Sequence, residues 1–275
     1  MKVKRKKITI GIFGYGNMGR AIGAQLKTAP MTQSGFEIFV YSRRAFEGRD
    51  RHRVLSPNDL FSKSDLLFMC IKPQDFYELT PFNRKDTKHL VVVSIMAGVR
   101  VAHIQKVFPG AKVVRTMPNL PLQIGQGVIG WYRKKGTFKR TAHAQFQKLF
   151  SVFGFSVELK NEKMLDSLTA VAGSGPAYVF LFLNALIKAA QKIGFNKILA
   201  TQIVTATVRG SLAYLSSIGN ADLEQLIERV RSKGGTTEAA LNTLKVNKYY
   251  AGWHQAVLHA YMRSKELSSH EDTRT

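Results

Sequence analysis

The fold of this chain is decided by one stretch near its start, Ile8-Thr9-Ile10-Gly11-Ile12-Phe13-Gly14-Tyr15-Gly16-Asn17-Met18-Gly19. Its first half, Ile8 to Phe13, is a short apolar run rich in β-branched residues, which indicates a buried strand. Its second half has the spacing G-x-G-x-x-G, and Arg20 to Leu26 follows with a helical pattern. Strand, glycine motif and helix in this order are typical of a turn that binds a dinucleotide.

Each glycine of the motif has its own physical task in such a turn. Gly14 allows the tight turn, Gly16 lets the pyrophosphate approach the main chain, and Gly19 lets helix and strand pack closely. We therefore expect a dinucleotide cofactor to be bound by the whole turn, that is by Gly14, Tyr15, Gly16, Asn17, Met18 and Gly19.

The next predicted strand, Phe36 to Tyr41, ends in Ser42-Arg43-Arg44. An enzyme that uses NAD places a carboxylate at this strand end, where it binds the ribose hydroxyls. A carboxylate would repel a 2′-phosphate, whereas an arginine can bind it through two parallel charge-assisted hydrogen bonds. Ser42, Arg43 and Arg44 therefore favour NADPH as the cofactor, with NADH as the less favoured alternative.

Five further apolar runs predict the remaining strands of an α/β domain with a doubly wound, Rossmann-type sheet. They are Asp65–Ile71, Leu90–Ile95, Lys112–Arg115, Gly127–Tyr132 and Phe155–Leu159. Ligands of such sheets lie where strands end, which here means Lys72-Pro73-Gln74 and Met96-Ala97-Gly98. The prolines of Met117-Pro118-Asn119-Leu120-Pro121 predict a stiff loop and not a helix, while Thr141–Phe153 is predicted to be helical.

After Asn161 the pattern changes to helix for almost the whole remaining chain, with a break at Ala172-Gly173-Ser174-Gly175-Pro176. The predicted helices are Ala177–Ile193, Ile198–Ile218, Leu223–Val230 and Trp253–Leu267. Tyr178 to Leu183 is apolar on all sides, and a small helical domain cannot bury such a segment alone. We therefore expect an obligate homodimer through these helices. The predicted domains are a dinucleotide-binding domain, residues 1–161, and a helical dimerisation and substrate domain, residues 162–275.

A second glycine-rich stretch, Ser232-Lys233-Gly234-Gly235-Thr236-Thr237, precedes a run of helix formers. Its glycines let a ligand approach the main chain, and the first amides of a helix lack partners inside the helix. Together with the helix dipole, these amides make a site for a carboxylate. An ordinary helix N-cap is the alternative interpretation of the same residues.

Composition restricts the class of protein. The chain has 275 residues, long enough for two domains, and a single cysteine, Cys70, which indicates a reducing compartment and a buried thiol. We expect a cytoplasmic protein, because the basic start has no signal-peptide pattern and no segment has the unbroken apolar length that crosses a bilayer. The formal net charge of +23 is spread along the chain, with no nucleic-acid-binding motif, so we expect no nucleic-acid partner.

Taken together, the motifs resemble the pyrroline-5-carboxylate reductase family along nearly the whole chain. The motifs that carry the resemblance are Gly14–Gly19, Ile71-Lys72-Pro73-Gln74, Ser94-Ile95-Met96-Ala97-Gly98, Met117–Pro121, Gly173-Ser174-Gly175-Pro176-Ala177-Tyr178 and Gly234-Gly235-Thr236-Thr237. The resemblance implies a Rossmann domain plus a helical dimerisation domain, often assembled into decamers. It also implies NAD(P)H-dependent reduction of L-1-pyrroline-5-carboxylate to L-proline, with hydride transfer to a cyclic imine and no metal.

The resemblance assigns roles to particular residues. It implies that Ser232 and the amides of Gly235 and Thr236 hold the substrate carboxylate, and that Gly234 also binds the substrate. Thr237 would bind the substrate as the catalytic group, with its hydroxyl pointing at the ring nitrogen. The further cofactor-binding residues that it implies are Asn58, Ile71, Lys72, Pro73, Ala97, Gly98 and Asn119. The chain departs from the family where Lys233 replaces a proline, where Ala172 replaces a serine and where Asn184 replaces an acidic residue.

Three other interpretations remain open at the level of sequence. A β-hydroxyacid-type dehydrogenase needs a catalytic lysine in a glycine-rich context, which neither Lys188 nor Lys192 has. A basic protein that binds nucleic acid or a membrane surface without catalysis would explain the charge. A homologue that binds the cofactor without turnover is the third, and the intact Gly-Gly-Thr-Thr stretch argues against it.

Overall fold

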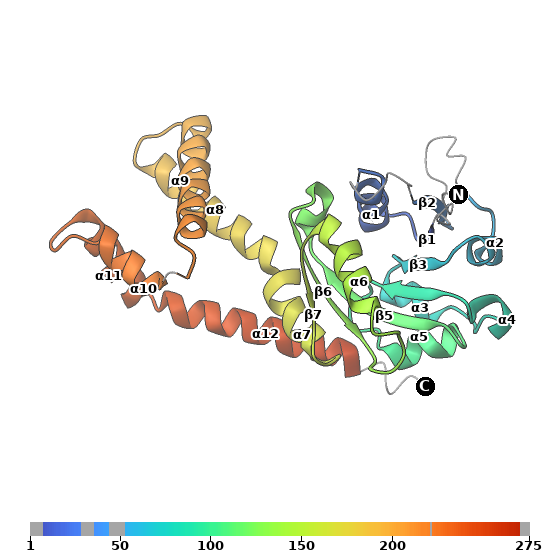
Figure 1. Cartoon of the computed structure of the whole chain (residues 1–275). Coiled ribbons are helices and arrows are strands. Elements are labelled where there is room, and N and C mark those ends of the chain that lie inside the picture. Colours follow the sequence, from blue (N-terminus) through green and yellow to red (C-terminus); the bar gives the residue numbers. More distant parts are fainter. Residues whose placement is uncertain (1–7, 29–35, 44–52, 221, 270–275) are drawn as a thin grey trace. The chain divides into compact units, whose positions relative to one another are not determined.

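The structure is a computed structural model, and it describes residues 8–28, 36–43, 53–220 and 222–269. The chain forms two compact units, Met1–Pro176 with Ala260–Thr275, and Ala177–His259 (Figure 1). This division differs from the predicted boundary after residue 161, because the segment that follows Asn161 packs on strands β5 and β6 of the first unit. The assignment of residues 1–161 to dinucleotide binding and of residues 162–275 to dimerisation and substrate binding stays a prediction.

The first unit is built on one seven-stranded sheet in the order β2-β1-β3-β4-β5-β6-β7. Its strands are β1 (Thr9–Phe13), β2 (Glu37–Tyr41), β3 (Leu66–Met69), β4 (Val91–Ser94), β5 (Lys112–Pro118), β6 (Gly127–Arg133) and β7 (Gly154–Glu158). All seven predicted strands are confirmed. Neighbouring strands are parallel except β5 and β6, which are antiparallel. The connection between those two is too short for a parallel crossover, which needs about a dozen residues or more.

Two layers of helices cover the sheet, because its buried strands present apolar side chains to both faces. One face packs against α1 (Asn17–Thr28) and α6 (Ala142–Phe150), and the other against α2 (Pro57–Ser62), α3 (Pro73–Tyr77) and α5 (Val101–Val107). The short helix α4 (Arg84–Thr87) packs against α2. In β3 the alternation is visible directly, since Phe68 belongs to the first apolar cluster and Leu67 to the second. The predicted α/β class is confirmed.

Two local predictions need correction. The segment after Asn119 is not a plain loop, since Leu120–Ile124 forms a 3-10 helix with Pro121 in its first turn, where a proline needs no N–H. The predicted helix Thr141–Phe153 ends earlier, because α6 gives way to the 3-10 turn Ser151–Phe153. The predicted break near Ala172 is observed as one turn of π-helix, Thr169–Gly173, between α7 (Met164–Leu168) and α8 (Gly175–Lys192).

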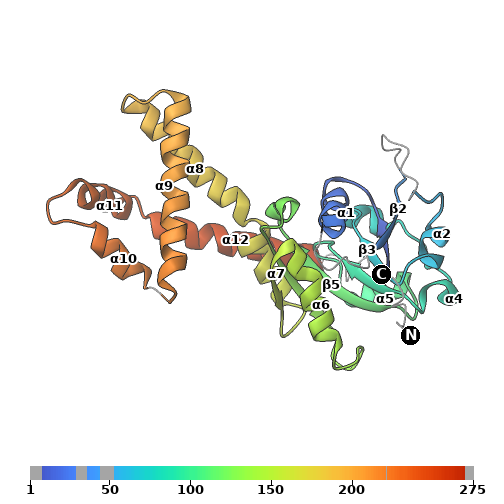
Figure 2. The same ribbon diagram turned by 45° about the horizontal axis from the view of Figure 1, so that its top comes forward.

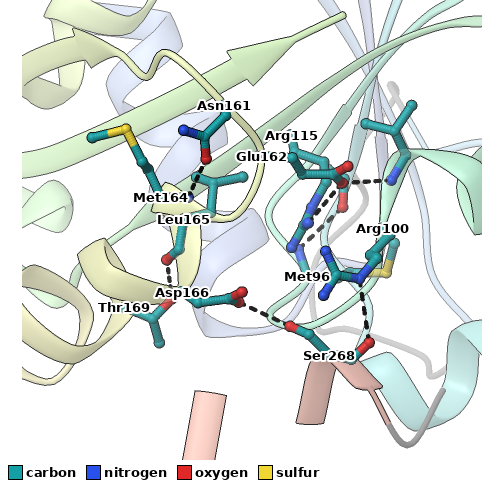
Figure 3. Close-up of polar contacts among 12 residues, drawn as sticks. Met96, Arg100, Arg115, Asn161, Glu162, Met164, Leu165, Asp166, Thr169 and Ser268 are labelled. Atoms are coloured by element: carbon teal, nitrogen blue, oxygen red, sulfur yellow. Dashed lines mark hydrogen bonds and ion pairs between the residues drawn. The ribbon is translucent and has the colours of Figure 1, made fainter. Parts of the chain in front are cut away.

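A buried polar network holds α7 and the end of α12 (Tyr249–Ser269) within the first unit (Figure 3). The Asp166 carboxylate, on a residue only 4% exposed, accepts hydrogen bonds from the hydroxyls of Ser268 at 2.8 Å and Ser264 at 3.3 Å. Beside it, Glu162 accepts from the Arg115 guanidinium and the Val101 amide, each at 2.8 Å. Buried polar and charged groups are costly unless they are hydrogen-bonded or paired, so these bonds favour one placement of both segments.

The second unit is helical, as predicted. It contains most of α8, then α9 (Lys197–Ile218), α10 (Leu223–Val230), α11 (Thr236–Val246) and the first part of α12 (Figure 2). Large apolar side chains of α8 and α9 are exposed in the single chain, among them Phe180, Leu181, Ile203 and Leu212. Tyr178, Tyr249 and Trp253 pack their rings edge to face.

Two helical stretches, Met164–Lys192 and Lys197–Ile218, are long and apolar enough to cross a membrane, judged by length and composition alone. The sequence expectation concerned an unbroken apolar run of about 18 residues, and neither stretch contains one. Asn184 and Lys188 interrupt the first stretch and Gln202 and Arg209 the second, yet each stretch stays apolar on average. Length and composition are weak grounds for a membrane span, because core helices of soluble proteins meet the same criterion.

Candidate active site

A cleft of about 390 Å³ lies at the carboxyl ends of β1, β2 and β3 in the first unit. The chain leaves β1 for β2 on one side and returns to β3 on the other, so this is the switch point at which open α/β sheets bind ligands. The cleft is lined by Phe13, Gly14, Tyr15, Gly16, Tyr41, Ser42, Arg43, Cys70, Ile71, Lys72 and Asp75.

The glycine geometry of the cleft fits a dinucleotide. Gly14 has a φ of 99°, and a Cβ there would lie 2.8 Å from the Cys70 carbonyl. A Cβ on Gly19 would lie 2.2 Å from the Gly14 carbonyl oxygen, so α1 can only pack this closely on a glycine. A Cβ on Gly16, by contrast, would meet no atom within 4 Å. The two flanking glycines therefore shape the turn, while the middle one leaves space for a pyrophosphate over the main chain.

The cleft brings together many of the predicted cofactor residues. Those that line it are Gly14, Tyr15, Gly16, Ser42, Arg43, Ile71 and Lys72. Asn17, Met18 and Gly19 follow directly as the first turn of α1. Arg44 lies outside the described residues.

The other predicted cofactor residues, Asn58, Pro73, Ala97, Gly98 and Asn119, are not among those that line the cleft. Asn58 lies in α2, and Pro73 begins α3. Asn119 is buried, and its side-chain amide donates to the Ala172 carbonyl at 3.1 Å while its oxygen accepts from the Val128 amide at 2.8 Å. These bonds give Asn119 a structural task, and its contact with a cofactor stays a prediction.

Sequence reasoning missed four residues of the cleft, Phe13, Tyr41, Cys70 and Asp75. The first two end strands β1 and β2, and Cys70 directly follows β3, so the rule that ligands lie at strand ends could have found all three. Burial raises the pKa of the Cys70 thiol, which keeps it protonated and makes it a poor nucleophile. Asp75 lies in helix α3 and not at a strand end, so the same rule does not identify it.

The charged end of the cleft is formed by Arg43, which lies just after β2. Its Nη2 lies 3.5 Å from Asp75 Oδ1, and its Nη1 donates to Glu78 Oε2 at 3.3 Å. All three side chains are exposed, at 54%, 44% and 65% respectively. A guanidinium in this position can bind a 2′-phosphate, but it already faces two carboxylates.

The second unit holds the predicted substrate-binding stretch. Helix α11 begins at Thr236, as predicted, with Gly235 as its N-cap and with Gly234 at a φ of 71°. The Gly234 amide donates to Glu238 Oε2 at 2.7 Å, and the Gly235 amide donates to the Ser232 carbonyl at 3.0 Å. The Gly235 amide is thus engaged in the turn, whereas Thr236 and Thr237 stand in the first helical turn, where amides lack helical partners.

Among the residues that the structure describes, no three His, Cys, Asp or Glu side chains gather as a metal site. The polar residues that line the cleft are the glycines of the turn, the hydroxyl-bearing Tyr15, Tyr41 and Ser42, the cations Arg43 and Lys72, and the carboxylate Asp75.

Comparisons with known proteins agree with this geometry. The family described as "Pyrroline-5-carboxylate reductase dimerisation" matches residues 162–267, and the one described as "NADP oxidoreductase coenzyme F420-dependent" matches residues 9–98. The pyrroline-5-carboxylate reductase of Synechocystis sp. is 33% identical over 266 residues, which cover 94% of this chain and 98% of the relative. That of Corynebacterium melassecola is 31% identical, covering 95% and 99%.

A solved structure gives the same result at the level of fold. Plasmodium falciparum pyrroline carboxylate reductase with NADP bound superposes with a TM-score of 0.84 at 26% identity, covering 95% of this chain and 98% of that one. The chain belongs to the pyrroline-5-carboxylate reductase family.

Proposed function

We propose that the chain reduces L-1-pyrroline-5-carboxylate to L-proline with NADPH, the last step of proline biosynthesis. The observation that carries this proposal is the joint presence of the glycine-shaped cleft with Arg43 and the Gly-Gly-Thr-Thr start of α11 in one member of this family. NADPH, when bound, supplies the hydride that attacks the carbon of the C=N bond.

The residues of the first unit would hold the cofactor in a defined orientation. The main chain from Gly14 to Gly19 would bind the pyrophosphate, since Gly16 leaves the backbone accessible there. Ser42 and Arg43 would bind the 2′-phosphate, with Arg44 as a further predicted contact. Ile71 and Lys72 line the same cleft and would lie along the cofactor. Asn58, Pro73, Ala97, Gly98 and Asn119 complete the proposed set.

The residues around the start of α11 would hold the substrate. The Thr236 amide and the Ser232 hydroxyl would bind the carboxylate at the positive end of the helix dipole. Gly234 and Gly235 would let the substrate approach, and Thr237 would donate its hydroxyl to the ring nitrogen. A cyclic imine is basic enough to arrive partly protonated, so holding the reactants in geometry supplies much of the catalysis.

The partners follow from the same proposal. We infer a homodimer in which the apolar faces of α8 and α9 are covered by the second copy, further assembly to a decamer, and a cytoplasmic location. A protein neighbour explains the two membrane-length helices without lipid. We infer no nucleic-acid partner, because the basic residues are spread along the chain.

The test is a steady-state assay of the purified protein with pyrroline-5-carboxylate and either NADPH or NADH. We expect oxidation of the cofactor, formation of proline, and a larger kcat/KM with NADPH. Cofactor binding without proline formation would identify a homologue without turnover. Binding to heparin without any cofactor binding would favour the basic binding protein.

A further inference from the structure

The contacts of Arg43 at the cofactor cleft go beyond what binding of a 2′-phosphate needs. Both of its terminal nitrogens face carboxylates, Nη2 toward Asp75 and Nη1 toward Glu78. End-on bidentate binding of a phosphate uses these same two nitrogens. A 2′-phosphate must therefore displace the two carboxylates or bind beside them.

The distances indicate contacts that exchange easily. At 3.5 Å and 3.3 Å they are longer than the roughly 2.7–2.9 Å of strong charge-assisted hydrogen bonds. All three side chains are also more than a third exposed, so water competes for each of them. Arg43 is thus held loosely and stays able to bind a ligand, but two carboxylates stand directly beside its guanidinium.

These charges act differently on the two cofactors. The 2′-phosphate of NADPH is an anion and is repelled by Asp75 and Glu78, so part of the attraction to Arg43 is cancelled. The 2′-hydroxyl of NADH is neutral and can donate a hydrogen bond to a carboxylate, as it does to the acid at the end of the second strand in NAD enzymes. Asp75 lines the cleft and offers this acceptor from α3.

We propose that Asp75 and Glu78 are specificity-determining residues, which lower the preference for NADPH over NADH below what Arg43 alone would give. This inference rests on one part of the proposed function, namely that the cleft binds a nicotinamide dinucleotide. It assigns Asp75 the additional task of accepting from the ribose hydroxyls of NADH, whereas Glu78 acts only by its charge on Arg43.

The experiment measures the dissociation constants of NADPH and NADH by fluorescence titration at low ionic strength. The variants are Asp75→Asn, Glu78→Gln and the double substitution, each of which removes a charge and keeps the shape of the side chain. We expect each single variant to bind NADPH about two- to fivefold more tightly, and the double variant about tenfold, as exposed ion pairs of this kind allow. For NADH we expect no gain with Glu78→Gln and weaker binding with Asp75→Asn.

Asp59→Asn is the matched control, because Asp59 pairs with Lys63 at 3.0 Å on the same unit and does not line the cleft. Its ratio of the two constants should equal that of the unaltered protein. Raising the salt to about 1 M should shrink the NADPH gains, since screening weakens exposed charges. An unchanged ratio in all three test variants, or an equal gain for both cofactors, would overturn the proposal.

Turnover with pyrroline-5-carboxylate is measured in parallel and separates the two proposals. A shifted NADPH-to-NADH ratio in a protein that makes no proline supports the specificity inference and contradicts the reaction. Normal proline formation with an unshifted ratio contradicts the specificity inference alone. If neither cofactor binds the unaltered protein, both proposals are wrong.

Discussion

At the scale of single residues, the proposed reaction places most weight on Thr237. Replacing Thr237 by alanine removes the donor to the ring nitrogen, so we expect kcat to fall about ten- to a hundredfold, the cost of losing one hydrogen bond to a charged group. The dissociation constant of NADPH should stay unchanged. Steady-state kinetics and a binding titration measure the two quantities.

The same helix provides the control for this prediction. Thr243→Ala makes the same chemical change on α11, where the Thr243 hydroxyl only donates to the Ala239 carbonyl at 3.1 Å. We expect it to be fully active, and Thr237→Ser to recover much of the lost activity. A Thr237→Ala protein with full kcat would remove Thr237 from the mechanism.

Sequence reasoning at this scale succeeded where a backbone conformation demands one residue type. The tasks predicted for Gly14 and Gly19 agree with a φ of 99° at the first and a close backbone approach at the second. It failed to foresee Asp75, because that carboxylate reaches the cleft through the fold of α3 and not through a motif. Asn119 lies inside a family motif, and its side-chain amide is bonded to the main chain through both its nitrogen and its oxygen. A motif residue can therefore have a structural task as well as the predicted one.

At the scale of elements, the geometry of the turn between β1 and α1 predicts different effects on stability and on cofactor binding for two similar substitutions. Gly16→Ala adds a methyl group where no neighbouring atom lies within 4 Å, so we expect the thermal midpoint to stay nearly unchanged while NADPH binding weakens strongly. Gly19→Ala places a Cβ 2.2 Å from the Gly14 carbonyl oxygen, so we expect a clear loss of stability. Thermal unfolding and cofactor titration of both variants measure this. Loss of stability in Gly16→Ala with intact binding would contradict the assignment.

The buried carboxylate of Asp166 makes the second prediction at this scale. Asp166→Ala leaves the buried hydroxyls of Ser264 and Ser268 without this acceptor, which should lower the free energy of unfolding by about 2 kcal/mol or more. Faster amide exchange should appear at the end of α12. Urea unfolding and hydrogen exchange by mass spectrometry measure the two effects.

Ser269, an exposed serine at the end of α12, serves as the comparison. Ser269→Ala removes an exposed hydroxyl that donates to the Glu266 carbonyl, and it should leave both measurements unchanged. Asp166→Asn keeps an accepting oxygen, so its free energy of unfolding and its exchange rates should lie between those of Asp166→Ala and Ser269→Ala. If Asp166→Ala exchanges as slowly as the unaltered protein at residues 264–269, the network does not anchor α12.

At the scale of the whole molecule, the sequence predicts the two kinds of architecture but not which distant segments pack together. The change from strand patterns to helix patterns after Asn161 is visible in the sequence, because side-chain periodicity is local. The packing of α7 and of the end of α12 with the first unit is not, because it depends on contacts such as Asp166 with Ser268, 102 residues apart. Long-range pairing of this kind leaves no periodic signal.

The exposed apolar helices make the last prediction, which concerns assembly. Leu181 on α8 is 64% exposed in the single chain, as are its neighbour Phe180 and Leu212 of α9 to a similar degree, and apolar residues exposed in such number mark a surface that a protein partner covers. We expect the purified protein, without detergent, to have a mass of at least twice the 30.8 kDa of one chain.

Leu181→Lys places a charge in the predicted interface and should shift the protein toward monomer or reduce its yield. Gln191→Lys, at an exposed polar position of the same helix, should leave the mass unchanged. Light scattering after size exclusion measures the mass, and a monomeric unaltered protein, or one recovered only from membranes with detergent, would show that α8 is covered by something other than a second copy.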